Sequence, residues 1–184
     1  MSNDDLVMKV CVMAVLPILT APDPVLKSKA KRVDAVDDRI RALMTDMLET
    51  MYKAPGIGLA APQVGALERV VVMDIGKTEE DRSPIRMANP EIIWASEADN
   101  TYEEGCLSVP EHYSNVTRPA EVKVRYLDET GQTREIHAEG LLATVVQHEM
   151  DHLDGILFID HISGLKRNMI LRKLLKAKKE AAES

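Results

Sequence analysis

The segment LLATVVQHEMDHL (141–153) decides how the rest of this chain is interpreted. Its first half is apolar on every side, which predicts a buried helix over residues 139–153. On a helix, residues four apart lie one turn apart on the same face, so His148 and His152 can hold one metal ion together. Glu149 follows the first histidine, where it can act as a general base on a water molecule. Burying three such residues without partners would be costly, and a metal ion would satisfy them together.

The five-residue pattern alone leaves other interpretations open, because H-E-x-x-H also occurs by chance on exposed helices. A catalytic zinc site normally has three protein ligands and one open position, so two histidines leave the site incomplete. A downstream third ligand would be typical of a zinc endopeptidase, and the candidates are Asp154, Asp160 and His161. Upstream, Cys106 is flanked by Gly105 and by charge, which is unusual for a core cysteine, and its thiolate would complete a His2Cys site. Asp151 is a candidate hydrogen-bond partner for a liganding histidine.

Length, composition and charge favour one globular domain. The 184 residues, 45% of them apolar, suffice to bury a sizeable core. The net charge of −7 argues against a general nucleic-acid binder, and no sequence-specific nucleic-acid contact is expected. Residues 163–184 are an exception, with seven Lys or Arg against two acidic residues. This basic tail is either a surface for an acidic partner or an ordinary solvated helix face.

Cysteine usage and the N-terminal region favour a cytoplasmic protein. Two cysteines, Cys11 and Cys106, are too few for a disulfide framework. The apolar run VCVMAVLPIL (10–19) follows Asp4 and Asp5 where a signal peptide has positive charge. It is also about half as long as a membrane-spanning helix. We interpret it as a buried N-terminal segment and expect no membrane association.

The order of the expected elements predicts an α+β fold. Apolar residues spaced by three and one place a single stripe along a helix over 37–53. β-branched runs and a turn sequence predict strands and a hairpin, which are expected at 69–76, 87–96, 101–110 and 121–140. A last helix is expected over about 163–180. Residues 21–34 are expected to be extended, and 56–65 contains too much Gly and Pro for regular structure.

Three segments together resemble the signature motifs of the peptide deformylase family, bacterial type. They are GIGLAAPQVG (56–65), EEGCLSVP (103–110) and QHEMDHLDG (147–155), in the family's order and at similar spacing. The resemblance extends from about Val15 to about Lys179, leaving residues 1–12 as an N-terminal extension and 13–184 as one catalytic domain. It implies antiparallel β-sheets packed around a central metal-bearing helix, followed by a C-terminal helix.

The resemblance also implies an activity. The family hydrolyses the formyl group from the N-terminal formylmethionine of newly synthesised polypeptides and releases formate. One divalent metal ion would be held by Cys106, His148 and His152, ferrous iron in most bacterial members, with zinc or nickel able to replace it. Glu149 would be the general base and then the acid. The side-chain amide of Gln63 and the backbone N–H of Leu107 would stabilise the developing oxyanion.

The family places a methionine pocket beside the metal. The residues implied for substrate binding are Ile57, Gly58, Glu104, Gly105, Leu141 and Val145. Arg118 is a candidate ion-pair partner of Glu104. The basic C-terminal helix would contact the ribosome, where the substrate emerges. The alternative for Val145 is ordinary core packing. The alternative for Gly58 is a simple turn that ends the preceding helix.

Two other functions remain as alternatives. A zinc endopeptidase would take its third ligand downstream and would not need Cys106. A homologue that has lost catalysis and serves as a binding module would be expected to lack a ligand, the glutamate or the glutamine. All five of these residues are present, which favours an active hydrolase: Gln63, Cys106, His148, Glu149 and His152.

Overall fold

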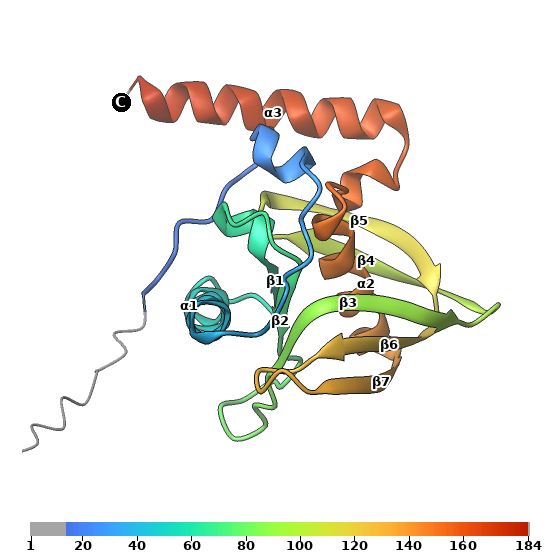
Figure 1. The fold of residues 1–184 in the computed structure, drawn as a ribbon. Helices are drawn as coiled ribbons and strands as arrows, with labels where there is room; N and C mark the ends of the chain where they lie inside the picture. Colours follow the sequence, from blue (N-terminus) through green and yellow to red (C-terminus); the bar gives the residue numbers. More distant parts are fainter. Residues whose placement is uncertain (1–13, 184) are drawn as a thin grey trace, which may run out of the picture.

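The computed structural model describes residues 14–183, so the extension predicted for residues 1–12 lies outside the described range. Two antiparallel sheets surround one central helix, α2 (Figure 1). The larger sheet has the strand order β1-β2-β3-β6-β7, and β4 and β5 form a separate hairpin. Helix α2 contacts strands of both sheets. The predicted α+β class, with sheets around a central helix and a C-terminal helix, is therefore confirmed.

The helices begin and end close to the predicted positions. They are α1 (Asp38–Lys53), α2 (Gly140–Leu153) and α3 (Gly164–Ala182), with short 3-10 turns η1 (Pro24–Lys27), η2 (Ala61–Val64) and η3 (Phe158–Asp160). The strands are β1 (Gly58–Ala60), β2 (Val70–Met73), β3 (Ile85–Ala95), β4 (Asp99–Cys106), β5 (Val109–Pro119), β6 (Glu121–Leu127) and β7 (Thr133–Glu139).

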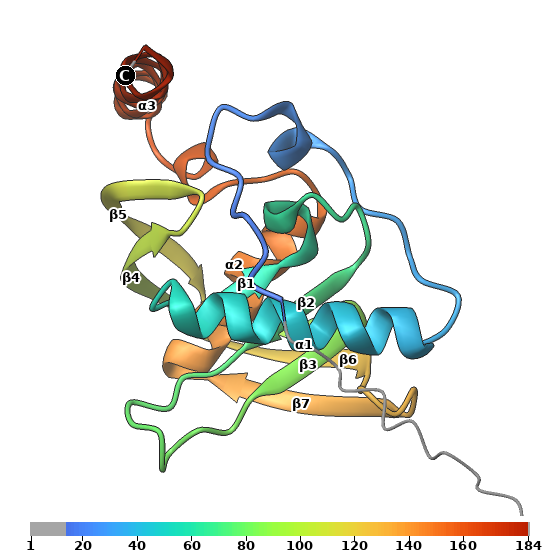
Figure 2. The ribbon, with the colours of Figure 1, turned by 90° about the vertical axis from the view of Figure 1, so that its left-hand side faces the viewer.

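The core explains the apolar side chains of α2. On one side its residues Val146 and Leu153 pack against inward-facing strand residues such as Met87 and Val124. On the other side of β1 and β2, helix α1 buries the stripe predicted from its spacing, and Ile40, with the methionines after it, is fully buried. Figure 2 shows α1 lying across these strands, with α3 set apart at the far end of the molecule. Helix α2 is thus held on several sides, which fixes the position of its polar end.

Two expectations for irregular or extended segments were wrong. Residues 21–34 contain η1, because the Asp23 side chain accepts a hydrogen bond from the Val25 N–H at 3.0 Å and Pro24 starts the turn. Residues 56–65 contain β1 and η2, because the edge of β2 supplies backbone partners for a short strand there. Pairing with a neighbouring strand is not visible in local composition.

The expected extended segment 101–110 is divided by a turn. Strand β4 ends at Cys106, the chain turns at Leu107 and Ser108, and β5 returns antiparallel to it. The sequence-based interpretation did not assign β5 beyond Pro110. This hairpin matters because it places Cys106 at a sharp reversal facing α2.

The ends of the described chain are exposed in part. Val15 is 49% exposed, whereas Leu16 and Ile18 pack against the α1 side of the core, so the expected buried segment is wrong for part of residues 14–19. At the other end, Ile170 and Leu174 attach α3 to the fold. Among the described residues, none of the helices has the length and apolarity required to span a bilayer.

Candidate metal centre and active site

One cysteine and two histidines from distant parts of the chain converge. The sulfur of Cys106 and ring nitrogens of His148 and His152 all lie within 4.8 Å of one another. Cys106 Sγ is 3.3 Å from His152 Nε2. The histidines lie one turn apart on α2, and Cys106 reaches them because β4 ends opposite this turn of the helix. Sulfur and imidazole ligands are typical of iron, zinc or nickel sites.

The residues present fit a bound metal ion by two further observations. Both histidines are buried. Glu104 occupies Nδ1 of His148, and Nε2 of His152 faces the Cys106 sulfur, so the Nε2 atoms are the ones available to a shared ion. Metal–ligand bonds of about 2.0–2.3 Å are compatible with three ligand atoms this close together. Three protein ligands leave a fourth position for water or substrate, as in catalytic sites.

The pKa values of the two histidine rings shift in opposite directions. Burial and the charge of His148 lower the pKa of His152 well below its usual value, so this ring is neutral. Burial also opposes protonation of His148, but hydrogen bonds with Cys106 and Glu104 and the negative charge of Cys106 and Glu149 outweigh it and raise the pKa of His148. A cation bound between these ligands would take the place of that proton.

His148 is held from two sides. Its Nδ1 lies 2.7 Å from Oε2 of Glu104. The other oxygen of Glu104, Oε1, pairs with Arg118 Nε at 2.6 Å. The ring of Phe158 stacks on the imidazole with centroids 6.3 Å apart. The predicted ion pair between Glu104 and Arg118 is thus present. Burial alone would raise the pKa of Glu104, but hydrogen bonds from His148 and Arg118 lower it to about 2.

The expectation for Asp151 was wrong. Its carboxylate accepts hydrogen bonds from Arg118 at 2.8 Å and His161 at 2.7 Å, and neither is a histidine of the convergent group. The sequence made Asp151 a candidate partner of a liganding histidine, but the partner of His148 is Glu104. Asp151 is near the histidines in sequence, whereas Glu104 reaches His148 from β4, 44 positions away.

Glu149 lies against the backbone of β1. It is 5% exposed, and burial raises its pKa to about 7. Its Oε2 has no hydrogen-bond partner among the described residues. A Cβ atom at Gly58 would lie 2.2 Å from Glu149 Oε1, so only glycine permits this close approach. A carboxylate with a pKa near neutrality suits a group that takes up and returns a proton.

Gln63 faces the same centre with a fixed orientation. Its Oε1 accepts a hydrogen bond from the Ala60 N–H at 2.8 Å. This leaves Nε2 to face Ser108 Oγ at 3.1 Å and Cys106 Sγ at 3.5 Å. The amide donor is therefore buried beside the sulfur, and its orientation is set by backbone that belongs to the same glycine-rich segment.

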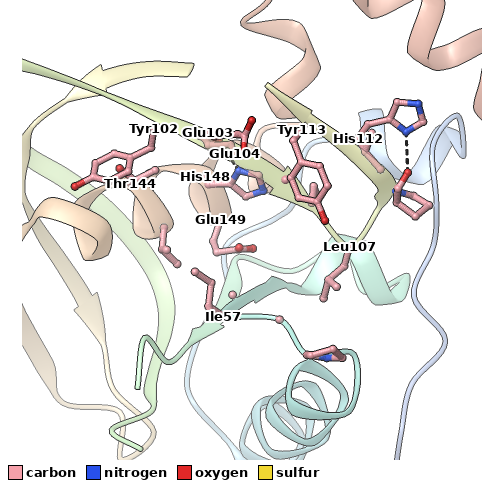
Figure 3. A pocket seen from close by; sticks show the side chains of 18 of the residues that line it. Ile57, Tyr102, Glu103, Glu104, Leu107, His112, Tyr113, Thr144, His148 and Glu149 are labelled. Carbon is pink, nitrogen blue, oxygen red and sulfur yellow. Dashed lines mark hydrogen bonds and ion pairs between the residues drawn. The ribbon is translucent and has the colours of Figure 1, made fainter. Parts of the chain in front are cut away.

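A cavity of about 530 Å³ opens onto these groups. Figure 3 shows Glu149, His148 and Glu104 on one side, with Ile57 and Leu107 below and beside them. Every residue predicted to bind substrate lines the cavity, namely Ile57, Gly58, Glu104, Gly105, Leu141 and Val145. Gln63, Cys106, Leu107, His148 and Glu149 line it too, whereas His152 lies behind them.

The sequence-based interpretation missed one wall of the cavity. The residues that form it belong to the start of β5: Val109, Pro110, Glu111, His112 and Tyr113. The Tyr113 ring packs on Gly105, where a Cβ atom would come within 2.5 Å of it. Glycine next to the metal-ligand candidate was the available signal, since it indicates close packing by an unidentified neighbour.

The downstream candidates for a third ligand do not join the group. Asp154 pairs with Arg69 at 2.9 Å, and Asp160 pairs with Lys27. His161 pairs with Asp151. The arrangement expected of a zinc endopeptidase with a downstream ligand is therefore not formed.

A partly buried cysteine sulfur and two buried imidazoles, next to a buried carboxylate at the base of a cavity, define the class of metal-assisted hydrolases. Comparison with known proteins identifies the family. Residues 15–168 match the family model described as polypeptide deformylase. The peptide deformylase of Phenylobacterium zucineum is 56% identical over 169 residues, which cover 92% of this chain and all of that protein. The peptide deformylase of Methylocella silvestris is also 56% identical, over 93% of this chain and 89% of that protein.

Solved structures agree with the sequence comparison. The crystal structure of peptide deformylase from Ehrlichia chaffeensis superposes with a TM-score of 0.87 at 38% identity, over 92% of this chain and 99% of that one. A peptide deformylase from Legionella pneumophila gives 0.85 at 45% identity, over 93% and 99% of the two chains. This chain belongs to the polypeptide deformylase family. It is a hydrolase that removes the formyl group from the N-terminal formylmethionine of newly synthesised polypeptides.

Proposed function

We propose that this chain deformylates nascent polypeptides with one divalent metal ion held by Cys106, His148 and His152. The ion proposed is ferrous iron, and zinc or nickel suits the same ligands. The observation that carries the proposal is the convergence of these three side chains beside Glu149, with both histidines buried and Cys106 partly buried. A bound ion would polarise the formyl carbonyl and activate water.

The protein's own groups move the protons. We assign to Glu149 the removal of one proton from the attacking water while the water oxygen adds to the formyl carbon. Its elevated pKa, about 7, favours both uptake and release of that proton near neutral pH. Glu149 then delivers the proton to the methionine nitrogen as the carbon–nitrogen bond breaks. The products are formate and a free amino terminus.

Gln63 and Leu107 are proposed to stabilise the oxyanion that develops on the formyl oxygen. Gln63 is supported by its Nε2, which faces the sulfur of Cys106 because the Ala60 N–H holds the other end of the amide. Leu107 lines the cavity directly after Cys106, so its backbone N–H is proposed as the second donor. Donors fixed in advance lower the barrier because they need no reorientation during the reaction.

The substrate is proposed to bind in an extended form. Strand β1 is at the edge of its sheet, and an edge strand can pair with a peptide backbone. The methionine side chain would occupy the apolar part of the cavity formed by Ile57, Leu141 and Val145. Glu104 lines the same cavity, but Arg118 and His148 occupy its carboxylate, so we assign it to positioning. Gly58 and Gly105 are proposed to contact the peptide through their backbone, because the space that a side chain would fill is occupied by Glu149 and Tyr113.

The test is formate release from a formyl-Met tripeptide by protein loaded with iron under anaerobic conditions. Replacing Glu149 with Gln preserves the shape of the side chain and is expected to reduce kcat by about 10²–10⁴-fold while the metal content stays the same. An acetyl-Met tripeptide is the substrate control. Undiminished formate release by Glu149→Gln would reject the proposed role of this residue.

The identity of the metal is tested by exposure to air. Ferrous iron and the Cys106 thiolate both oxidise, so the iron-loaded enzyme is expected to lose activity in air and to keep it under nitrogen. The nickel-loaded enzyme is the matched control. If the protein isolated without added metal keeps full activity in air, iron is not the native ion.

The basic C-terminal helix is proposed to contact the ribosome. The enzyme is proposed to act in the cytoplasm, and residues 13–184 are proposed to form one catalytic domain. The cations assigned to phosphate contacts are exposed on α3: Arg172, Lys173, Lys176, Lys178 and Lys179. Charge reversal of three of them to Glu should weaken ribosome co-sedimentation and leave turnover of a short peptide nearly unchanged. Unaltered co-sedimentation contradicts the proposal.

A further inference from the structure

The hydrogen bonds that hold His148 continue to the protein surface. Glu104 Oε2 lies 2.7 Å from His148 Nδ1, and Arg118 contacts both oxygens of Glu104, at 2.6 and 3.0 Å. The third nitrogen of Arg118, Nη1, donates to Asp151 Oδ2 at 2.8 Å. The same oxygen lies 2.7 Å from His161 Nε2. An unbroken series of charged hydrogen bonds therefore connects the ring of His148 to His161.

Burial decreases steadily along this series. The side chains of Glu104 and Arg118 are 4% and 7% exposed, that of Asp151 is 21% exposed, and that of His161 is 36% exposed. The outermost link is therefore the one that solvent can replace. Asp151 Oδ2 accepts from two donors, and the direction of the carboxylate is fixed only while both are in place. Without His161, water competes for Asp151, and Arg118 loses a partner with a defined position.

The segment that carries His161 also contacts His148 directly. Phe158, at the start of η3, stacks on the His148 imidazole with an interplanar angle of 22°. Three residues later, His161 ends the hydrogen-bonded series that reaches the same imidazole from the Glu104 side. One short segment, 158–161, thus restrains one ring by packing and by hydrogen bonding.

We propose that His161 is a positioning residue for the metal centre, acting on His148 through Asp151, Arg118 and Glu104. The proposal rests on the metal-ligand role assigned to His148 above. Partners of a metal ligand orient its ring and tune its basicity, and their loss typically reduces metal affinity by about 10–100-fold. His161 acts from further out, so the effect expected is near or below the lower limit of that range, about three- to tenfold.

The test measures the metal site without substrate. Cobalt(II) is the probe, because its visible absorption depends on the geometry of its ligands. His161→Ala is expected to lose cobalt to a chelator about three- to tenfold faster than the unchanged protein, with a shifted absorption band. His161→Gln retains an N–H donor at a similar distance along the side chain. It should restore both the rate and the spectrum, which a loss of packing alone would not predict.

The chain offers a matched control in His137. This histidine is 41% exposed and pairs with Glu121 at 2.8 Å, so it resembles His161 in exposure and hydrogen bonding but belongs to β7. His137→Ala should leave cobalt release and the spectrum unchanged. Urea unfolding of each variant separates a metal effect from a folding defect, and Asp151→Asn replaces His161→Ala should the latter not fold.

Three results decide the matter. Faster cobalt loss in His161→Ala, restored in His161→Gln, supports the proposal. Equal cobalt loss and equal spectra in the unchanged protein and His161→Ala overturn it while leaving the proposed ligands intact. Failure of the unchanged protein to bind cobalt overturns the ligand assignment itself, and the inference that rests on it.

Discussion

Within residues 14–183, two groups of side chains have the composition and spacing of metal ligands. Cys106, His148 and His152 form one, and a second lies on β6 and β7. Its members are Glu121, His137 and Glu139. The two groups satisfy the same distance criterion, yet the first is enclosed by α2 and the β4–β5 turn, whereas the second is largely exposed on a sheet. Proximity of ligand atoms alone does not identify a functional site.

The difference lies in what each group would lose without a metal ion. In the exposed group His137 lies between the two glutamates, at 2.8 and 3.7 Å, and water solvates the remaining atoms. In the buried group the Cys106 sulfur makes long contacts, 3.3 Å to His152 Nε2 and 3.5 Å to Gln63 Nε2, and both imidazoles are shielded from water. Polar atoms that are removed from water and weakly paired are costly, so an additional partner such as a metal ion is expected in the buried group. The exposed ion pairs are complete without one.

The largest expected difference is in metal content. Cys106→Ala removes the sulfur ligand, so the purified variant is expected to contain almost no bound metal and to release no formate. Glu121→Gln, the equivalent loss from the exposed group, should retain one metal ion per chain and full activity. Metal analysis of both variants after gel filtration is the measurement. Retention of metal and activity by Cys106→Ala would exclude Cys106 as a metal ligand.

A second difference concerns stability, because each group contains a Glu–His pair of nearly equal length. The pairs are Glu104–His148 at 2.7 Å and Glu121–His137 at 2.8 Å. Breaking a buried pair leaves uncompensated charge and costs about 3–5 kcal/mol, whereas an exposed pair contributes about 0–1 kcal/mol. Glu104→Gln should therefore lower the free energy of unfolding of the metal-free protein by about 3 kcal/mol. Urea denaturation of Glu104→Gln and of Glu121→Gln measures the two losses of stability, and equal losses would contradict the argument from burial.

The buried group is also the one that the sequence made visible. H-E-x-x-H on an apolar helix predicted its two histidines, and the three motifs in order led to Cys106 and Gln63. Local spacing on one helix is fixed by helix geometry, so such pairs can be read from sequence. Helices α1 and α3 were likewise predicted within a few residues of their observed limits.

Contacts between distant segments were the part that sequence did not provide. The β4–β5 turn, which carries the wall around Tyr113 and sets Glu104 against His148, depends on pairing between strands. Asp151 was a candidate histidine partner because it is near in sequence, but His148 is paired with Glu104 of β4, 44 positions away. Register between strands is set by the whole sheet, so local patterns cannot specify it.

A third difference is the side-chain amide of Gln63, which lies beside the buried group. Gln63 Nε2 lies 3.5 Å from Cys106 Sγ, and its orientation is fixed by the Ala60 N–H. Gln63→Leu removes the proposed oxyanion donor and is expected to lower kcat by about 10²–10³-fold, with a smaller change in KM. Because the Ala60 N–H also loses its acceptor, the free energy of unfolding should be measured alongside. A kcat within twofold of the unchanged enzyme would exclude the oxyanion role.

The smallest expected effect is the pH dependence of the stability that Glu104 provides. Hydrogen bonds from His148 and Arg118 outweigh burial and lower the pKa of Glu104 from 4.5 to about 2. A carboxylate with a lowered pKa stabilises the fold above its unfolded pKa, and this contribution disappears as pH falls through the folded value. The stability difference between the metal-free protein and Glu104→Gln should therefore be constant above about pH 5 and shrink between pH 4.5 and about 2. Urea midpoints across this range test it, since a difference that stays constant down to pH 2 would mean that ionised Glu104 does not stabilise the buried group.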